Sequence, residues 1–222
     1  MSRTSGLALG RVIFATLAVA AILVQLVDLG GRGILKPVSY FSYFTIDSNL
    51  IAVACLLAGA ALRGGARSAS LDLVRGGAVV YMSVTGIVFT LLLSGTDVDT
   101  AIPWVNSVVH ELMPLVIVSD WLLDPPHGRL RMLDGPLWLS FPSAWIVYIL
   151  IRGAIGGLYP YPFLNPANGG YGTVAAYCGA ILLIMLVVCC LVVILGNVAH
   201  GGQQRWAAAA VDSRRPGRWD GR

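Results

Sequence analysis

Six long apolar segments alternate with short polar stretches along the chain. Most of them approach the length of about 20 residues that a helix needs to cross roughly 30 Å of hydrocarbon. The pattern therefore predicts an all-α fold, a bundle of about six transmembrane helices. The fifth segment is the shortest and contains Pro142, which membrane helices tolerate where neighbouring helices satisfy the freed backbone groups. The predicted spans are residues 12–29, 41–62, 74–93, 104–123, 136–151 and 174–197.

Composition agrees with this class of protein. Of the 222 residues 57% are hydrophobic and only 12% are charged, a balance that excludes an ordinary soluble domain. No internal repeat is evident, so residues 1–200 are predicted to form one transmembrane domain. Residues 201–222 are rich in Arg, Gly and Ala and predict a disordered tail held near anionic lipid headgroups. No motif indicates nucleic-acid binding.

The distribution of basic residues predicts the orientation, because positive charges are retained on the cytoplasmic side. Only Arg32, Lys36 and Arg152 of the 15 basic residues fall in segments predicted to lie outside. Both termini are therefore predicted to be cytoplasmic, and the loop with Asp97 and Asp99 to face outward. The abundance of Arg, Ala and Gly favours a bacterial source and the bacterial cytoplasmic membrane.

Polar side chains inside two predicted spans are the candidate functional residues, because such groups are costly in a membrane. The second span holds Thr45 and the fourth holds His110. With a helical rise of about 1.5 Å per residue, Thr45 lies roughly 6 Å below Phe41. By the same rise, His110 lies roughly 9 Å below Trp104. These similar depths predict that the two side chains meet in one shallow pocket near the outer leaflet.

Nucleophilic catalysis is one chemistry that this pair could perform. A threonine hydroxyl is a poor nucleophile unless a base lies within hydrogen-bond reach, and neutral imidazole is a common base. Thr45 is thus a candidate nucleophile and His110 its base. Asn49, Asn106 or a freed backbone N–H could stabilise an oxyanion. Pro114 removes the helical partner of the His110 carbonyl and predicts a kink beside the histidine.

A structural interpretation of the same residues stays open. A threonine in a membrane helix most often bonds back to a carbonyl one turn earlier, and a lone histidine most often joins two helices. Arg152, at the outer end of the fifth span, could pair with Asp47 or Glu111. It could also hold a substrate carboxylate through its planar guanidinium group.

The four cysteines lie in apolar segments and are expected to behave as small hydrophobic residues. They indicate neither a disulfide framework nor a metal site, and we expect no cofactor. They are Cys55, Cys178, Cys189 and Cys190.

Three short stretches form an ordered set along the chain. They read Phe44-Thr45-Ile46-Asp47, then Trp104-Val105-Asn106-Ser107-Val108-Val109-His110 followed by Pro114, then Tyr161-Pro162-Phe163-Leu164. The set resembles the androgen-induced-gene family of integral membrane threonine hydrolases, which cleave fatty acid esters of hydroxy fatty acids. The resemblance implies that Thr45 is the nucleophile and His110 its base. The family's proline lies one residue farther from the histidine, so the substrate here could be another lipid ester.

We therefore predict a membrane-embedded lipid-ester hydrolase whose substrate is a membrane lipid or lipid ester. The alternative from another class is a non-enzymatic transporter or lipid-binding protein. Its polar site would be formed by Asp47, His110 and Glu111. The missing internal repeat and the scarcity of charges argue against a transporter. The sequence sets neither the acyl length nor the oligomeric state.

Overall fold

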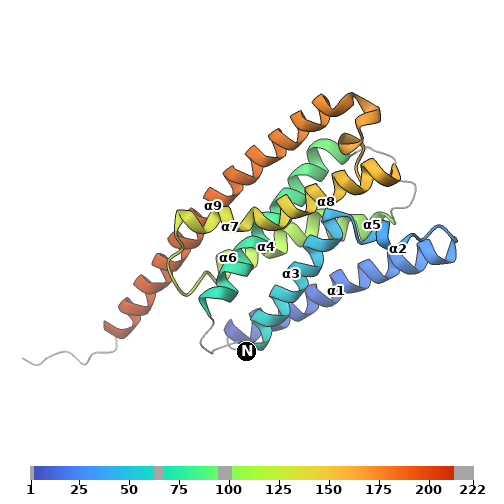
Figure 1. Ribbon diagram of the computed structural model, residues 1–222. Helices are drawn as coiled ribbons and strands as arrows, with labels where there is room; N and C mark the ends of the chain where they lie inside the picture. Colours follow the sequence, from blue (N-terminus) through green and yellow to red (C-terminus); the bar gives the residue numbers. More distant parts are fainter. Residues whose placement is uncertain (1–2, 63–67, 95–101, 213–222) are drawn as a thin grey trace, which may run out of the picture.

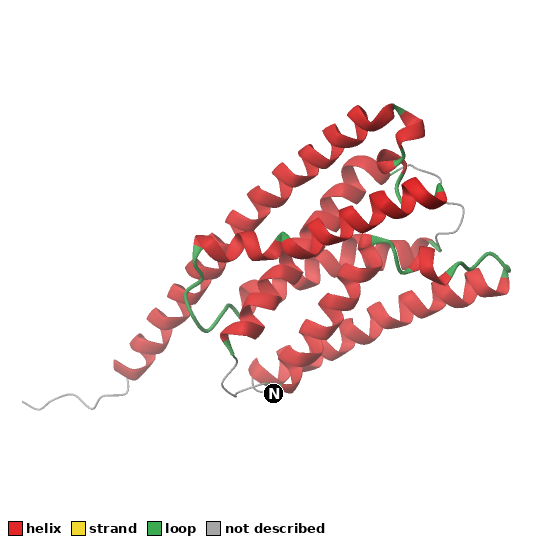
Figure 2. Cartoon of the chain, in the orientation of Figure 1, coloured by secondary structure: helices red, strands yellow, loops and turns green. Residues whose placement is uncertain are grey.

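The computed structural model describes residues 3–62, 68–94 and 102–212 of the chain. Every regular element in this part is a helix and none is a strand (Figure 2), which confirms the predicted all-α fold. The elements, in chain order, are α1 (Arg3–Gly31), α2 (Pro37–Tyr40), α3 (Phe44–Ala61), α4 (Ala69–Val88), the π-helical η1 (Phe89–Leu93), α5 (Pro103–Ser107), the π-helical η2 (Val108–Leu112), α6 (Met113–Leu123), η3 (Met132–Asp134), α7 (Gly135–Trp138), α8 (Ser140–Gly156), η4 (Pro162–Leu164), η5 (Pro166–Asn168) and α9 (Gly170–Asp212).

Five helices are long and apolar enough to cross a membrane by length and composition. They correspond to five of the six predicted spans and are residues Thr4–Gly31, Phe44–Ala61, Ala69–Leu93, Met132–Gly156 and Gly170–Gly202. The expected fourth span is present as a composite of α5, η2 and α6. It is helical from Pro103 to Leu123, but its middle is π-helical. The structure is thus an all-α bundle with five candidate membrane-spanning helices, and the predicted fourth span is the composite helix beside them.

The helices form a bundle (Figure 1), in which α3 and α4 are the most buried of the five candidate spans and α8 and α9 the least buried. The start of α1 and the end of α9 lie at the same end of the bundle (Figure 1). Helix α1 packs along α3, and its buried face carries Ala15, Ala18 and Ala21 at three-residue spacing. Such small side chains let membrane helices approach closely.

Near the start of α1, buried charges join three helices. The Arg11 guanidinium donates to Asp120 Oδ1 at 2.6 Å and to Asp124 Oδ2 at 2.5 Å. The Arg75 guanidinium donates to Asp120 Oδ2 at 2.8 Å and to Asp72 Oδ1 at 3.3 Å. Asp120 of α6 thereby links Arg11 of α1 to Arg75 of α4. Removing one member of such a buried network would leave its charged partners without compensation. The network therefore holds α1, α4 and α6 together at this end of the bundle.

Several predicted boundaries differ from those observed. Helix α8 begins at Ser140, so Pro142 lies in its first turn, where the missing N–H breaks no helical hydrogen bond. Helix α9 continues to Asp212, so residues 201–212 of the predicted disordered tail are helical. The four alanines at 207–210 favour this, since Ala has the highest helix propensity. Residues 213–222 of that tail and the loop with Asp97 and Asp99 lie outside the described residues.

Candidate functional site

Thr45 lies in the first turn of α3, where aromatic side chains hold the helix against α8. The ring of Phe44 stacks on that of Phe141 with centroids 5.5 Å apart. Trp145 Nε1 donates to the backbone carbonyl of Ser42, just before α3, at 3.1 Å. Thr45 itself is 5% exposed. The start of α3 is thus fixed from α8, and the backbone N–H of Thr45 is one of the first four of the helix, which have no intrahelical partner.

His110 lies in the π-helical segment η2, and Pro114 explains why that segment is there. The N–H of Met113 bonds to the carbonyl of Val108, five residues earlier. The corresponding donor for the Val109 carbonyl would come from Pro114, which has no N–H. The amide of Asn49 on α3 supplies the missing donor, since its Nδ2 donates to the Val109 carbonyl at 3.0 Å. π-Helical segments are frequent at functional sites.

Asn49 therefore connects the two helices that carry the candidate pair. Its Nδ2 also donates to the carbonyl of Thr45 at 2.8 Å, and its side chain is fully buried. Both N–H groups of the amide are thus engaged with backbone carbonyls. Asn49 was one of three alternative oxyanion donors, beside Asn106 and a freed backbone N–H, and in the structure its amide joins α3 to η2.

The two side chains that we expected to meet do lie together. Thr45 Oγ1 is 3.2 Å from His110 Nε2. The other ring nitrogen, Nδ1, is 3.2 Å from the carbonyl oxygen of Asn106. A carbonyl oxygen only accepts, so Nδ1 carries the proton and Nε2 offers its lone pair to Thr45. The Phe89 ring stacks on the imidazole at 4.3 Å and holds its plane.

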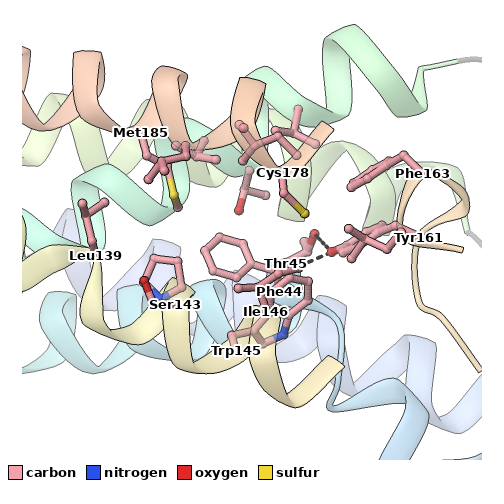
Figure 3. Close-up of a pocket in the computed structure, with 18 of the residues that line it drawn as sticks. Phe44, Thr45, Leu139, Ser143, Trp145, Ile146, Tyr161, Phe163, Cys178 and Met185 are labelled. Carbon is pink, nitrogen blue, oxygen red and sulfur yellow. Dashed lines mark hydrogen bonds between the residues drawn. The ribbon is translucent and has the colours of Figure 1, made fainter. Parts of the chain in front are cut away.

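Tyr161 is a third member of the site, and we did not predict it as a site residue. It precedes η4 in the loop between α8 and α9, and its hydroxyl accepts the Thr45 N–H at 3.4 Å. The same hydroxyl lies 3.4 Å from Thr45 Oγ1, and both contacts are drawn in Figure 3. Burial raises the pKa of Tyr161 to about 12, so the hydroxyl stays protonated and can donate. The Tyr-Pro-Phe-Leu stretch was the only sequence signal for it.

Two cavities of different character meet at Thr45 and Tyr161. One has a volume of about 300 Å³ and lies between α3, α4, α8 and α9. Its wall is mostly apolar and runs from Phe163 past Thr45 towards Leu139 and Met185 (Figure 3). The other, of about 580 Å³, includes His110 and a set of polar residues in its wall, and we call it the polar cavity because it is the more polar of the two. These polar residues are Gln25, Lys36, Ser39, Asn106, Asn165 and Asn168.

The remaining predicted residues fall in different places. Asn106 lines the polar cavity beside His110, so its side chain is available to a ligand there. Arg152 lies outside the walls of both cavities, and its Nη2 donates to Ser39 Oγ at 2.9 Å. Asp47 and Glu111 line neither cavity, and Glu111 is exposed on the surface of the composite helix. The structure thus groups His110 with Thr45 and apart from the two acids.

No cluster in the described part of the chain resembles a metal site. Groups of three or more His, Cys, Asp or Glu side chains that could hold a metal ion are absent from residues 3–62, 68–94 and 102–212. The four cysteines, all within these ranges, are free thiols. The candidate site itself consists of the Thr45 hydroxyl, the His110 imidazole and the Tyr161 phenol.

The fold and the site together define a helical membrane protein with a hydrogen-bonded Thr–His–Tyr group at the junction of two cavities. Comparison of the chain with protein-family models, with curated proteins and with solved structures finds no match. The geometry of the site is therefore the basis for assigning a function.

Proposed function

We propose that the protein is a membrane-embedded lipid-ester hydrolase with Thr45 as nucleophile and His110 as general base. The observation that carries this proposal is the 3.2 Å contact between Thr45 Oγ1 and His110 Nε2. It is supported by the engaged Nδ1, which leaves Nε2 free to accept the threonine proton. A nucleophile within reach of a base that is itself oriented by a third group is the arrangement of covalent catalysis.

Acylation would proceed as follows. Thr45 Oγ1 attacks the ester carbonyl carbon while its proton passes to His110 Nε2. The carbonyl oxygen becomes an oxyanion, which the Tyr161 hydroxyl and the Thr45 N–H stabilise by donating to it. In the structure the Thr45 N–H donates to the Tyr161 hydroxyl, and this hydroxyl lies 3.4 Å from Oγ1. Both groups therefore lie beside the nucleophile, and the oxyanion would replace the Tyr161 oxygen as the acceptor of the Thr45 N–H. The bond to the leaving alcohol then breaks, the alcohol takes the proton from His110, and Thr45 carries the acyl group.

Deacylation reverses these roles with water. His110 Nε2 removes a proton from a water molecule, whose oxygen attacks the acyl carbon. The bond to Thr45 Oγ1 breaks, and the threonine oxygen takes back the proton from His110. One ester and one water thus become one acid and one alcohol. The polar cavity, which contains His110 in its wall, is the side from which water reaches the acyl group.

The two cavities suggest the shape of the substrate. The apolar cavity fits the acyl chain, and the polar cavity fits the alcohol part or its headgroup. Lys36 lies in the wall of the polar cavity, so a carboxylate on that part could find a cation there in place of Arg152. We accordingly propose membership of the androgen-induced-gene family of threonine hydrolases, with fatty acid esters of hydroxy fatty acids among the candidate substrates.

The proposed location follows from the charge distribution. We propose the bacterial cytoplasmic membrane, with both termini in the cytoplasm and the Thr45 end of the bundle at the outer leaflet. The basic segment after residue 200 would then lie against anionic headgroups of the inner leaflet.

Labelling with a fluorophosphonate probe in detergent tests the proposal. Wild-type protein should be labelled, and Thr45→Ala and His110→Ala should both lose the label. Thr85→Ala is the matched control, because Thr85 is also a buried threonine in the wall of the apolar cavity. It should be labelled like wild type, and all variants should elute as folded protein.

Loss of labelling in the two site variants alone would justify a screen of lipid esters. Wild-type protein without label would refute an activated Thr45 and favour a lipid-binding protein. Equal labelling of Thr45→Ala and wild type would show that another residue reacts.

A further inference from the structure

One side of the apolar cavity reaches the surface of the bundle. The residues that α3 and α4 contribute to its wall are largely buried, and Thr45 and Val84 are only 5% and 3% exposed. The residues from the other side differ. Ser143 of α8 and Gly179 of α9 line the same cavity and are exposed, and Leu182 is 47% exposed. Wall residues that are also exposed mark an opening between α8 and α9.

Gly179 shows that this opening is not filled by neighbouring side chains. A Cβ atom at Gly179 would meet nothing within 4 Å. By contrast, Gly76 packs on Trp138 and Gly153 packs on Tyr159. Leu182 follows Gly179 by three residues and so lies on the same face of α9. We define the α8–α9 slot as the opening bordered by Ser143, Gly179 and Leu182.

The depth and surroundings of the slot determine what it faces. Gly179 is nine residues after Gly170, the first residue of α9, which places it about 13 Å along the helix. A bilayer has a hydrocarbon core about 30 Å thick, so this depth lies among the lipid chains. The surface around the slot is apolar, since Val147, Leu183 and Leu186 are 56%, 63% and 43% exposed. The slot therefore opens towards lipid tails.

We propose that the α8–α9 slot is a lateral portal, through which the hydrocarbon chain of a membrane-dissolved lipid ester enters the apolar cavity. The proposal rests on the proposed function and adds the route and the physical state of the substrate. The chain slides in sideways from the bilayer, and the ester comes to lie at Thr45. The polar cavity serves water and the alcohol product. The preferred substrates are then lipids dissolved in the membrane, in preference to esters dissolved in water.

A glycine pair on α9 provides the variants for a test. Gly179→Leu places a side chain at the slot, and its Cβ atom would meet nothing within 4 Å. Gly172→Leu is the matched control, because Gly172 is also exposed on α9, also meets nothing within 4 Å, and does not line the cavity. Both changes replace a helical glycine by a better helix former, so their effects on helix stability are similar.

The first measurement does not depend on catalysis. Each protein is reconstituted in phosphatidylcholine vesicles containing a long-chain fatty acid with a diazirine near the end of its chain. After illumination, mass spectrometry locates the cross-linked residues. Wild-type protein and Gly172→Leu should be labelled at residues 178–185 of α9 and 142–146 of α8. Gly179→Leu should lose this label by about tenfold, the effect of removing about 1.4 kcal/mol of binding. Unchanged labelling in Gly179→Leu would overturn the portal.

The second measurement links the portal to turnover. The rate for a long-chain ester in vesicles is divided by the rate for a short-chain water-soluble ester. This ratio should fall about tenfold in Gly179→Leu and stay constant in Gly172→Leu. An unchanged ratio in Gly179→Leu would overturn lateral access. If wild-type protein hydrolyses neither ester, the proposed function fails, whereas the cross-linking result still decides whether the slot admits lipid chains.

Discussion

Replacing Tyr161 by Phe removes one hydroxyl from the site and leaves the ring. The ring contacts persist, since Tyr161 stacks on Phe163 with centroids 5.2 Å apart and meets Tyr43 edge-on at 5.6 Å. Two hydrogen bonds are lost, the one from the Thr45 N–H and the one with Thr45 Oγ1. The change therefore separates the chemistry of the phenol from its packing.

The magnitude follows from the proposed role of the hydroxyl. Loss of one oxyanion donor lowers kcat about 10²–10³-fold, or about 2.7–4 kcal/mol of transition-state stabilisation. The Thr45 N–H remains as the second donor, so some activity should persist. KM should change little, because the oxyanion forms only in the transition state. The unpaired Thr45 N–H should lower the free energy of unfolding by about 1–3 kcal/mol.

The assay is steady-state hydrolysis of a lipid ester in mixed micelles, with thermal unfolding measured in parallel. Tyr43→Phe is the matched control. Its ring lies against Tyr161, and Tyr43 lines the polar cavity, but no hydrogen bond of the described residues joins its hydroxyl to Thr45 or His110. A Tyr161→Phe protein that keeps kcat within about tenfold of wild type would refute an oxyanion donor here. Equal losses in both variants would mean that the effect comes from removing a hydroxyl from this part of the protein, and not from the loss of an oxyanion donor at Thr45.

Three further variants test how the bundle and the site are held. Asp120→Asn removes the carboxylate that two buried arginines share, so thermal unfolding should show a loss of stability of about 3–5 kcal/mol. The control is Asp28→Asn, in an exposed pair at 3.4 Å, which should change stability by less than about 1 kcal/mol. Similar losses in both variants would contradict the buried network. Pro114→Ala supplies the missing N–H and lets η2 relax towards an α-helix, which turns His110 away from its partner. Activity should then fall by about 10²-fold, as expected for a displaced general base, with thermal stability kept, and full activity would count against the π-helical argument. Asn49→Ala removes two hydrogen bonds, which are worth about 0.6 kcal/mol each on average between membrane helices. Because these bonds join the helices of Thr45 and His110, kcat should fall by a larger factor than this small loss of stability would explain. A loss of stability with unchanged kcat would limit Asn49 to a structural role.

The helical plan could be predicted because the bilayer allows few alternatives. A membrane-spanning helix must satisfy its backbone hydrogen bonds internally and present apolar side chains to the lipid, and a sequence that meets both requirements can be recognised. The fourth span shows the limit of this reasoning. Pro114 predicted a local break, but the type of break depends on where the freed carbonyls find donors. Here the donor is the amide of Asn49, a residue on another helix.

The candidate pair was predictable for a related reason. Thr45 and His110 lie at similar depths on helices that enter from the same face, and depth is one coordinate that a sequence gives for membrane helices. Tyr161 was not predictable in this way. It lies in a loop, 116 residues after Thr45, and loop residues have no fixed depth or facing direction. The slot between α8 and α9 could not be predicted either, because it depends on how these two helices pack against the rest of the bundle.

The depth of Thr45 matters for the proposed reaction because its two halves need opposite surroundings. Acylation requires a hydrocarbon chain beside the nucleophile, whereas deacylation requires water at the same carbon. Thr45 is the second residue of α3, and it lies in the walls of both the apolar and the polar cavity. One helical turn deeper, at about 5.4 Å, the hydroxyl would lie away from His110 and Tyr161. One turn earlier it would precede the helix and lose the free N–H groups of the first turn. A nucleophile on a membrane helix can thus serve both half-reactions only at the boundary between the two cavities, which is where the first turn of α3 holds Thr45.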